Sequence, residues 1–143
     1  MQLSVLIADD EPLAREGLSL LLRQHVLTRE VRMARNGREA VNMIRQHRPD
    51  LVLLDIQMPG MNGFEVVDAV GAEHMPMVIF VTAHDQYAIR AFEISATDYL
   101  LKPVTQERFN QALERATVRL RAVPSERARL RSRSSSAPVM RSA

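Results

Sequence analysis

LLDIQMPGMNG, residues 53–63, is the stretch that decides the fold. It joins the end of an apolar run, Leu51–Leu54, to a carboxylate at Asp55, then to turn residues, and finally to Asn62, which can cap a helix. A short unbroken apolar run is typical of a strand that is covered on both faces. The stretch therefore predicts a strand, a loop and a helix in succession, with an acidic side chain at the carboxyl end of the strand.

The same succession repeats along the chain. Four further apolar runs are Leu3–Ala8, Val31–Ala34, Met77–Thr82 and Tyr99–Leu101. Segments with helical periodicity follow the runs: Pro12–His25, Gly37–His47, the residues after Asn62, Gln86–Ile94, and Thr105 to about Ala122. Five alternations of strand and helix predict an α/β fold of the (βα)5 type, a doubly wound parallel sheet with helices on both faces. For doubly wound, flavodoxin-like sheets of this size the known strand order is 2-1-3-4-5, and ligands bind beyond the carboxyl ends of the strands.

Local signals place several helix starts and faces. Pro12 suits the first turn of a helix, and Asn36 with Glu39 three residues later predicts a capped N-terminus. In the fourth helical segment we expect Ala88, Ala91 and Phe92 to share one inward face.

Composition narrows the class of protein. With 46% apolar residues, the 143-residue chain can form one domain with a core, and it contains no cysteine, which excludes disulfides and thiolate chemistry. The N-terminal apolar run has no basic residues before it, and three acidic residues follow it, so we expect no signal peptide. No apolar run approaches the roughly 18 residues that span a bilayer. These features favour a cytoplasmic protein without membrane contacts.

Positive charge gathers at the C-terminus. Residues 124–143 hold five arginines and one glutamate, a net charge of +4, so residues 1–123 carry −2 of the chain's total of +2. We expect a domain over 1–122 and, over 123–143, a disordered Arg/Ser-rich tail or the stub of a linker. The arginines could contact DNA phosphates, although a solvated linker is the simpler interpretation.

Three carboxylates follow two of the predicted strands. Asp9 and Asp10 end the first run, and Asp55 ends the third. The carboxyl ends of parallel strands lie along the same edge of the sheet, called the rim below, so these side chains converge there. Two like charges about 4 Å apart repel by roughly 4 kcal/mol at an effective dielectric constant of about 20. A hard divalent cation such as Mg²⁺ relieves that repulsion. A single aspartate here would more simply be a helix cap, but three together favour a metal site.

Two more polar side chains are predicted at the same rim. Thr82 ends the fourth run and offers a hydroxyl, and Lys102 follows the fifth run and offers an ammonium that can pair with phosphate. A plain salt bridge from Lys102 to the carboxylates is an equally good interpretation. Lys102-Pro103 is also a candidate cis peptide bond, which the sequence leaves open.

These motifs, in this order, resemble the receiver domains of bacterial response regulators over residues 3–122. The matching segments are VLIADDEP at 5–12, LLDIQMPGMNG at 53–63, VTA at 81–83 and YLLKP at 99–103. The segment TAHDQYAIRAFE at 82–93 resembles the LytTR/AlgR-type subgroup. In that subgroup a C-terminal DNA-binding output domain usually follows the receiver, and this chain is too short to contain one.

The resemblance implies a role for each site residue. Asp55 would accept a phosphoryl group from a histidine kinase, and Lys102 and Thr82 would hold the phosphoryl oxygens. Mg²⁺ would be bound by Asp10, Asp55 and the main-chain carbonyl of Gln57, with Asp9 acting through a water. Tyr99 would turn inward as Thr82 moves; a partly buried packing role is the alternative for Tyr99. The role of His84 stays open.

The switch that the resemblance implies would change one surface of the domain. It consists of the fourth helix, the fifth strand and the fifth helix, through which phosphorylated copies would form a homodimer. The domain would catalyse only its own phosphorylation and dephosphorylation, so it is not expected to be an enzyme in the ordinary sense.

Three other classes of protein are weighed against this one. A haloacid-dehalogenase-like phosphatase needs an aspartate at position 57, where Gln57 stands, and a nucleotide binder would not place three acids after its first strand. The serious alternative is a constitutive receiver-like interaction module that is not regulated by phosphorylation.

Overall fold

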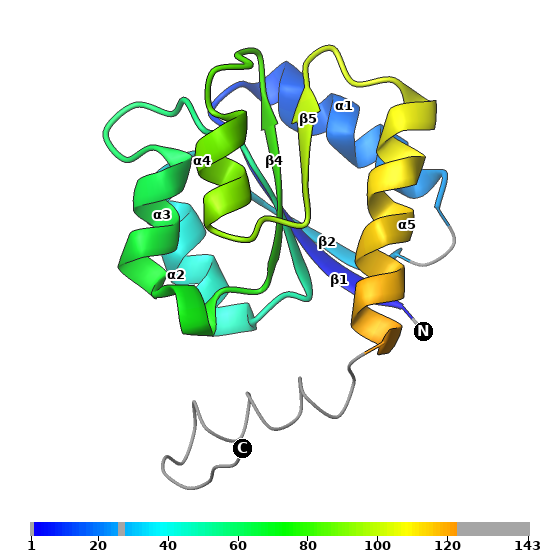
Figure 1. Ribbon diagram of the computed structural model, residues 1–143, viewed down its shortest axis with the longest axis horizontal. Helices are drawn as coiled ribbons and strands as arrows, with labels where there is room; N and C mark the ends of the chain where they lie inside the picture. The colour runs from blue at the N-terminus through cyan, green and yellow to red at the C-terminus, as the bar shows by residue number, and fades with distance from the viewer. Residues whose placement is uncertain (1, 26–27, 123–143) are drawn as a thin grey trace, which may run out of the picture.

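The chain folds as the alternating pattern predicts. The structure is a computed structural model that describes residues 2–25 and 28–122. One parallel sheet has the order β2-β1-β3-β4-β5, with a helix after each strand (Figure 1). The strands are β1 (Leu3–Ala8), β2 (Thr28–Ala34), β3 (Leu51–Leu54), β4 (Met77–Thr82) and β5 (Asp98–Leu101). The helices are α1 (Pro12–Arg23), α2 (Gly37–His47), α3 (Gly63–Val70), the 3₁₀ turn η1 (Ala72–His74), α4 (Ala88–Glu93) and α5 (Gln106–Ala122).

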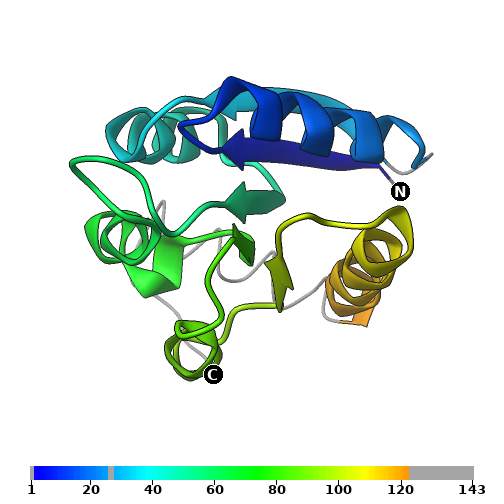
Figure 2. The ribbon, with the colours of Figure 1, turned by 90° about the horizontal axis from the view of Figure 1, so that it is seen from above.

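Two apolar cores lie on the two faces of the sheet. Alternate residues of β1 divide between them, because successive side chains of a strand point to opposite faces: Leu6 packs with α2, α3 and α4, whereas Val5 packs with α1 and α5. Figures 1 and 2 show the sheet between these two groups of helices. Both faces of β3 are covered, which explains why its four residues are all apolar.

The predicted helix caps are present. Asn36 accepts a hydrogen bond from the Glu39 amide at the start of α2, and Asn62 and Glu65 form a reciprocal capping box at the start of α3. Pro12 stands in the first turn of α1. The cap at Asn62 fixes where the segment after Asp55 becomes helical, and so fixes the length of the β3–α3 loop (55–62).

Two expectations about elements were wrong. Strand β2 begins at Thr28 rather than Val31, because its first residues are polar side chains of an edge strand that no apolar pattern reveals. Helix α4 has six residues, and only Ala91 is buried, whereas Phe92 is 83% exposed. Each residue of a helix turns the side chain by about 100°, so Phe92 points away from the face that Ala91 buries.

The described residues contain no helix that is long and apolar enough to cross a membrane. Residues 123–143 lie outside the described part, so a domain ending at 122 followed by a tail or linker stub stays a prediction.

Candidate functional site

Strand register brings the first and third carboxylates together. Ala8 pairs with Leu54, so Asp9 and Asp55 leave neighbouring strands at the same level. The Asp55 amide donates to the Ala8 carbonyl over 2.9 Å, which continues the β1–β3 ladder one residue beyond the end of β3. The predicted convergence of these aspartates at the carboxyl rim is therefore present in the structure.

The rim forms an acidic cluster. One carboxylate oxygen each from Asp9, Asp10 and Asp55 lies within 4.8 Å of the others. Asp9 is fully buried and Asp55 is 5% exposed, whereas Asp10 is partly exposed. Burial and the negative charge of Asp9 raise the pKa of Asp55 to about 7, against the pull of Lys102. At neutral pH this carboxyl group is therefore poised between its two protonation states.

Lys102, the one lysine of the sequence, supplies the positive charge of the rim. Its Nζ lies 2.9 Å from Asp9 Oδ2, 3.4 Å from Glu11 Oε1 and 3.6 Å from Asp55 Oδ2. Burial by itself would lower the pKa of Lys102, but the hydrogen bond to Asp9 and the charges of Asp55 and Asp9 outweigh it, and the net shift is upward. The peptide bond between Lys102 and Pro103 is cis. The contact with Glu11 was not foreseen from the sequence.

The donor set of the rim suits a hard divalent cation. Three carboxylates present oxygen ligands, the kind that Mg²⁺ prefers. Asp9 Oδ2 is buried, and Lys102 Nζ lies 2.9 Å from it. One lysine for three close carboxylates leaves negative charge that a cation would neutralise, so the residues present fit a magnesium ion.

The side chains of Thr82 and Tyr99 both form hydrogen bonds with the backbone of His84, which lies in the β4–α4 loop (83–87). Thr82 is fully buried, and its Oγ1 accepts a hydrogen bond of 3.3 Å from the His84 amide. The hydroxyl of Tyr99, which is half-buried, donates to the His84 carbonyl. Burial raises the pKa of Tyr99, so its phenol stays protonated and able to donate. One backbone residue thus connects the two side chains that the sequence predicts as a switch.

Sequence reasoning missed the contact of the Gln57 side chain. Gln57 was expected to contribute a main-chain carbonyl, but its Nε2 also donates to the Tyr87 hydroxyl over 3.1 Å. The two residues are 30 positions apart, and no periodicity links them. Only their placement after neighbouring strands, β3 and β4, could have suggested that they meet.

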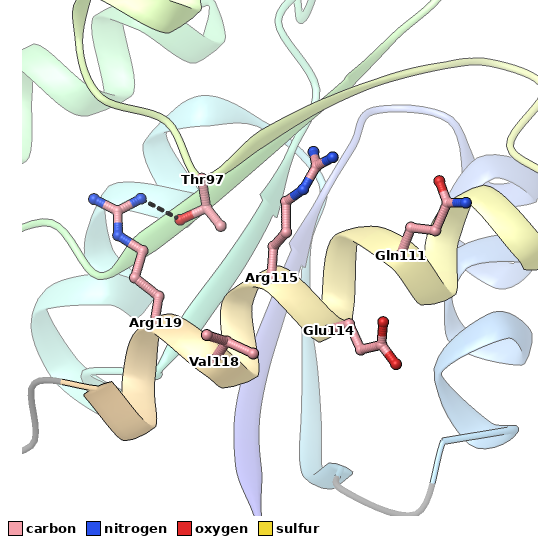
Figure 3. A pocket seen from close by; sticks show the side chains of 6 residues that line it. All are labelled: Thr97, Gln111, Glu114, Arg115, Val118 and Arg119. Atoms are coloured by element: carbon pink, nitrogen blue, oxygen red, sulfur yellow. Dashed lines mark hydrogen bonds between the residues drawn. The ribbon is translucent and has the colours of Figure 1, made fainter.

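A surface hollow lies on another part of the molecule. Figure 3 shows its lining, which comes from α5 and from Thr97 just before β5: Thr97, Gln111, Glu114, Arg115, Val118 and Arg119. Arg119 donates to the Thr97 hydroxyl over 3.0 Å. None of the predicted site residues lines this hollow, so it is separate from the acidic rim.

The fold and the acidic rim together define a class, the doubly wound proteins with clustered carboxylates beyond the ends of β1 and β3. Comparison with known proteins narrows this class. Residues 5–114 match the family model described as response regulator receiver domain. The chain therefore belongs to the family of response-regulator receiver domains.

Curated relatives and solved structures agree with this assignment. The chain is 47% identical over 113 residues to the transcriptional regulatory protein BtsR of Salmonella typhi, covering 79% of this chain and 47% of that protein. It is 48% identical over 117 residues to the positive alginate biosynthesis regulatory protein of Pseudomonas aeruginosa, covering 80% and 47%. The receiver domain of the putative regulator NarL from Mycobacterium tuberculosis superposes with a TM-score of 0.73 at 34% identity, over 81% of this chain and 97% of that one.

The relatives support the predicted subgroup as well. They include the sensory transduction protein LytT of Enterococcus faecalis, 39% identical over 137 residues, 94% of this chain and 57% of that protein. Together with the alginate regulator, this agrees with the LytTR/AlgR type. The chain spans about half the length of these relatives, and its matching part is a receiver domain homologous to those of transcriptional regulators.

Proposed function

We propose that this domain is a phosphorylation switch whose acceptor is Asp55. The observation that carries the proposal is the position of Asp55: buried, within 4.8 Å of two other carboxylates, and 3.6 Å from the ammonium of Lys102. Membership of the receiver family supports a histidine kinase as the phosphoryl source.

The transfer that we propose is a displacement at phosphorus. A carboxylate oxygen of Asp55 attacks, the bond between phosphorus and the kinase histidine breaks, and an acyl phosphate forms while the histidine nitrogen keeps the electron pair. Asp55 must be ionised to attack, and its pKa of about 7 makes that ionisation sensitive to conditions near neutrality. Lys102 favours the ionised form and lies where it can pair with a phosphoryl oxygen.

Magnesium completes the proposed site. Asp10, Asp55 and the main-chain carbonyl of Gln57 would bind Mg²⁺ directly, and Asp9 would do so through a water. When bound, the ion supplies positive charge against the oxygens of the phosphoryl group. Asp9 and Asp10 would thereby hold Mg²⁺ beside Asp55, which would offset the repulsion among the three carboxylates.

Thr82 and Tyr99 would convert phosphorylation into a change of surface. A new dianion on Asp55 attracts the Thr82 hydroxyl, which must then give up its hydrogen bond from His84. Tyr99 is bonded to the same residue and follows the loop. The surface of α4, β5 and α5 would change, provided that the two arrangements differ by only a few kcal/mol.

That surface also supports the proposed homodimer. Four large apolar side chains of α4, β5 and α5 are exposed: Ile89, Phe92, Leu101 and Val118. Sedimentation with and without a phosphoryl analogue should show the mass rising towards that of a dimer, and Phe92→Ser should reduce the rise. An unchanged mass at high concentration would contradict the dimer.

DNA contacts would come through an output domain in the remaining half of a longer protein. Family membership supports a cytoplasmic location.

The direct test is intact mass after incubation with Mg²⁺ and a small-molecule phosphodonor. The wild-type protein should gain one phosphoryl group only when Mg²⁺ is present. Asp55→Asn should gain none, whereas Asp68→Asn, a change at an exposed aspartate of α3, should behave as the wild type. A folded wild-type protein that gains nothing would favour the constitutive interaction module.

A further inference from the structure

One contact joins the loops that flank the acceptor. In the β3–α3 loop, the Gln57 amide donates to Asp55 Oδ1 over 3.2 Å, while the Gln57 side chain reaches across to the Tyr87 hydroxyl at 3.1 Å. Tyr87 is the last residue of the β4–α4 loop and precedes α4. A single glutamine therefore touches both the acceptor and the far end of the loop that begins after Thr82.

The Tyr87 ring is held in place by its neighbours. It packs edge-on against Phe64, with ring centroids 5.9 Å apart and planes at 62°, and it lies beside the core of α2, α3 and α4. Phe64 is itself 3% exposed and packs on Phe80 of β4. Because the ring has little freedom, its hydroxyl loses little further conformational entropy when it accepts a hydrogen bond from Gln57.

The β4–α4 loop is thus held at two separate points. His84 is bonded to Thr82 and Tyr99, which fixes the start of the loop against β4 and β5. Tyr87 fixes its end against the loop that carries Asp55. The second contact therefore keeps the end of the β4–α4 loop beside the loop that carries the acceptor, which Thr82 must approach to reach a phosphoryl group.

We propose that Tyr87 is a positioning residue that, through Gln57, tethers the β4–α4 loop across the acceptor and favours the closed arrangement of the site. This inference rests on the proposed function, because it names a determinant of the same switch. The tether lowers the cost of closing the loop on the phosphoryl group, and it also restricts the approach of water to the acyl phosphate. It acts through Gln57 and the loop, without touching the phosphoryl group itself.

The test is the affinity of the full chain for beryllofluoride, a phosphoryl analogue, in excess Mg²⁺. Tyr87→Phe keeps the ring on Phe64 and removes only the hydroxyl. One hydrogen bond of this kind should change the affinity about two- to tenfold, so we expect Tyr87→Phe to bind the analogue that much more weakly. Its acyl phosphate should also be hydrolysed faster than that of the wild type.

Two further variants separate a tether from other effects. In a double-mutant cycle with Gln57→Ala, the two losses should not add, because Gln57→Ala should weaken binding little further once Tyr87→Phe has removed the hydroxyl. Asn110→Ala removes an amide hydrogen bond of 2.8 Å on the exposed side of α5, away from both loops, and should leave the affinity unchanged.

Each outcome decides the proposal. Equal binding by wild type and Tyr87→Phe would overturn it, and so would independent losses from the two substitutions. A lower unfolding midpoint with unchanged affinity would make Tyr87 a purely structural residue. A folded wild-type protein that neither binds the analogue nor takes up a phosphoryl group would instead overturn the proposed function, and the tether with it.

Discussion

Asp55 and Asp98 are equally hidden aspartates in opposite surroundings. Each side chain is 6% exposed. Asp55 faces two other carboxylates and a single lysine, and its pKa is raised to about 7. Asp98 receives Arg108 and Arg115 at 2.8 Å each. Burial by itself would raise the pKa of Asp98, but the hydrogen bonds from Arg108 and from the Tyr99 amide outweigh it and lower that pKa.

The surroundings of Asp55 suit a reactive site, whereas those of Asp98 stabilise the fold. The carboxylate of Asp98 ties β5 to α5 and is stabilised by the folded chain. The carboxylate of Asp55 is destabilised by the same fold, because ionising it brings like charges together in a buried place. The carboxylates near Asp55 repel one another, and a bound cation or a proton can remove that repulsion.

The largest effect that we predict comes from crowding the backbone at Asp55. A Cβ on Gly63 would lie 2.6 Å from the Asp55 carbonyl oxygen and 3.0 Å from Ile56 Cα, both backbone atoms. We expect Gly63→Ala to lower the free energy of unfolding by about 3 kcal/mol, measured by urea denaturation. In Gly17→Ala, where nothing lies within 4 Å, the α1 helix should gain about 0.5–1 kcal/mol. Equal effects at the two glycines would contradict the close packing beneath the acceptor.

The next largest effect concerns the stabilising aspartate. Asp98→Asn removes the charge that two arginines contact, and we expect it to cost about 2 kcal/mol at pH 7. Because the pKa of Asp98 is lowered in the folded chain, its contribution is present above its ordinary pKa and is lost as the pH falls through the folded value. The difference between wild type and variant in chemical denaturation should therefore shrink in strong acid. A difference that did not depend on pH would argue against the ion pairs.

Asp55→Asn should act in the opposite direction. A raised pKa means that the folded chain binds a proton between about pH 4 and 7 that the unfolded chain has released, so the wild type loses stability as the pH rises through that range. At pH 8 without divalent cations, we expect Asp55→Asn to be more stable than the wild type by about 1–2 kcal/mol, and the gain should vanish near pH 4. Excess Mg²⁺ should stabilise the wild type more than the variant. If Asp55→Asn destabilised the protein at pH 8, repulsion between Asp55 and the neighbouring carboxylates would not be the dominant effect at this position.

The smallest effect falls on the loop between the acceptor and α3. Asn62→Ala removes one half of the capping box, and we expect a loss of about 1 kcal/mol in thermal or urea unfolding. Asn36→Ala at the start of α2 removes a cap without the reciprocal bond and serves as the comparison. If the cap at Asn62 also holds the loop of Asp55, only Asn62→Ala should weaken Mg²⁺ binding.

The sequence predicted the positions of residues that follow the ends of strands. It did not predict contacts between side chains that are far apart in the sequence. Asp9 and Asp55 could be placed at one rim because parallel strands share a direction. The partners of Asp98 could not be foreseen, since both arginines come from α5 and Asp98 itself stood just outside the predicted strand. Gln57 and Tyr87 meet only because two loops approach each other. Phe92 was misplaced because an apolar residue in a short helix was assumed to face inward.

Lys102 also determines how the domain responds to amine-reactive reagents. Apart from the N-terminal amine, it is the sole primary amine of the chain, and its raised pKa keeps it protonated and unreactive among the carboxylates. Acylating labels at mild pH should therefore modify the chain terminus first and spare the lysine. A cation that draws Asp9 and Asp55 away would make Lys102 more reactive, so a single labelled peptide in a mass spectrum would report occupancy of the rim.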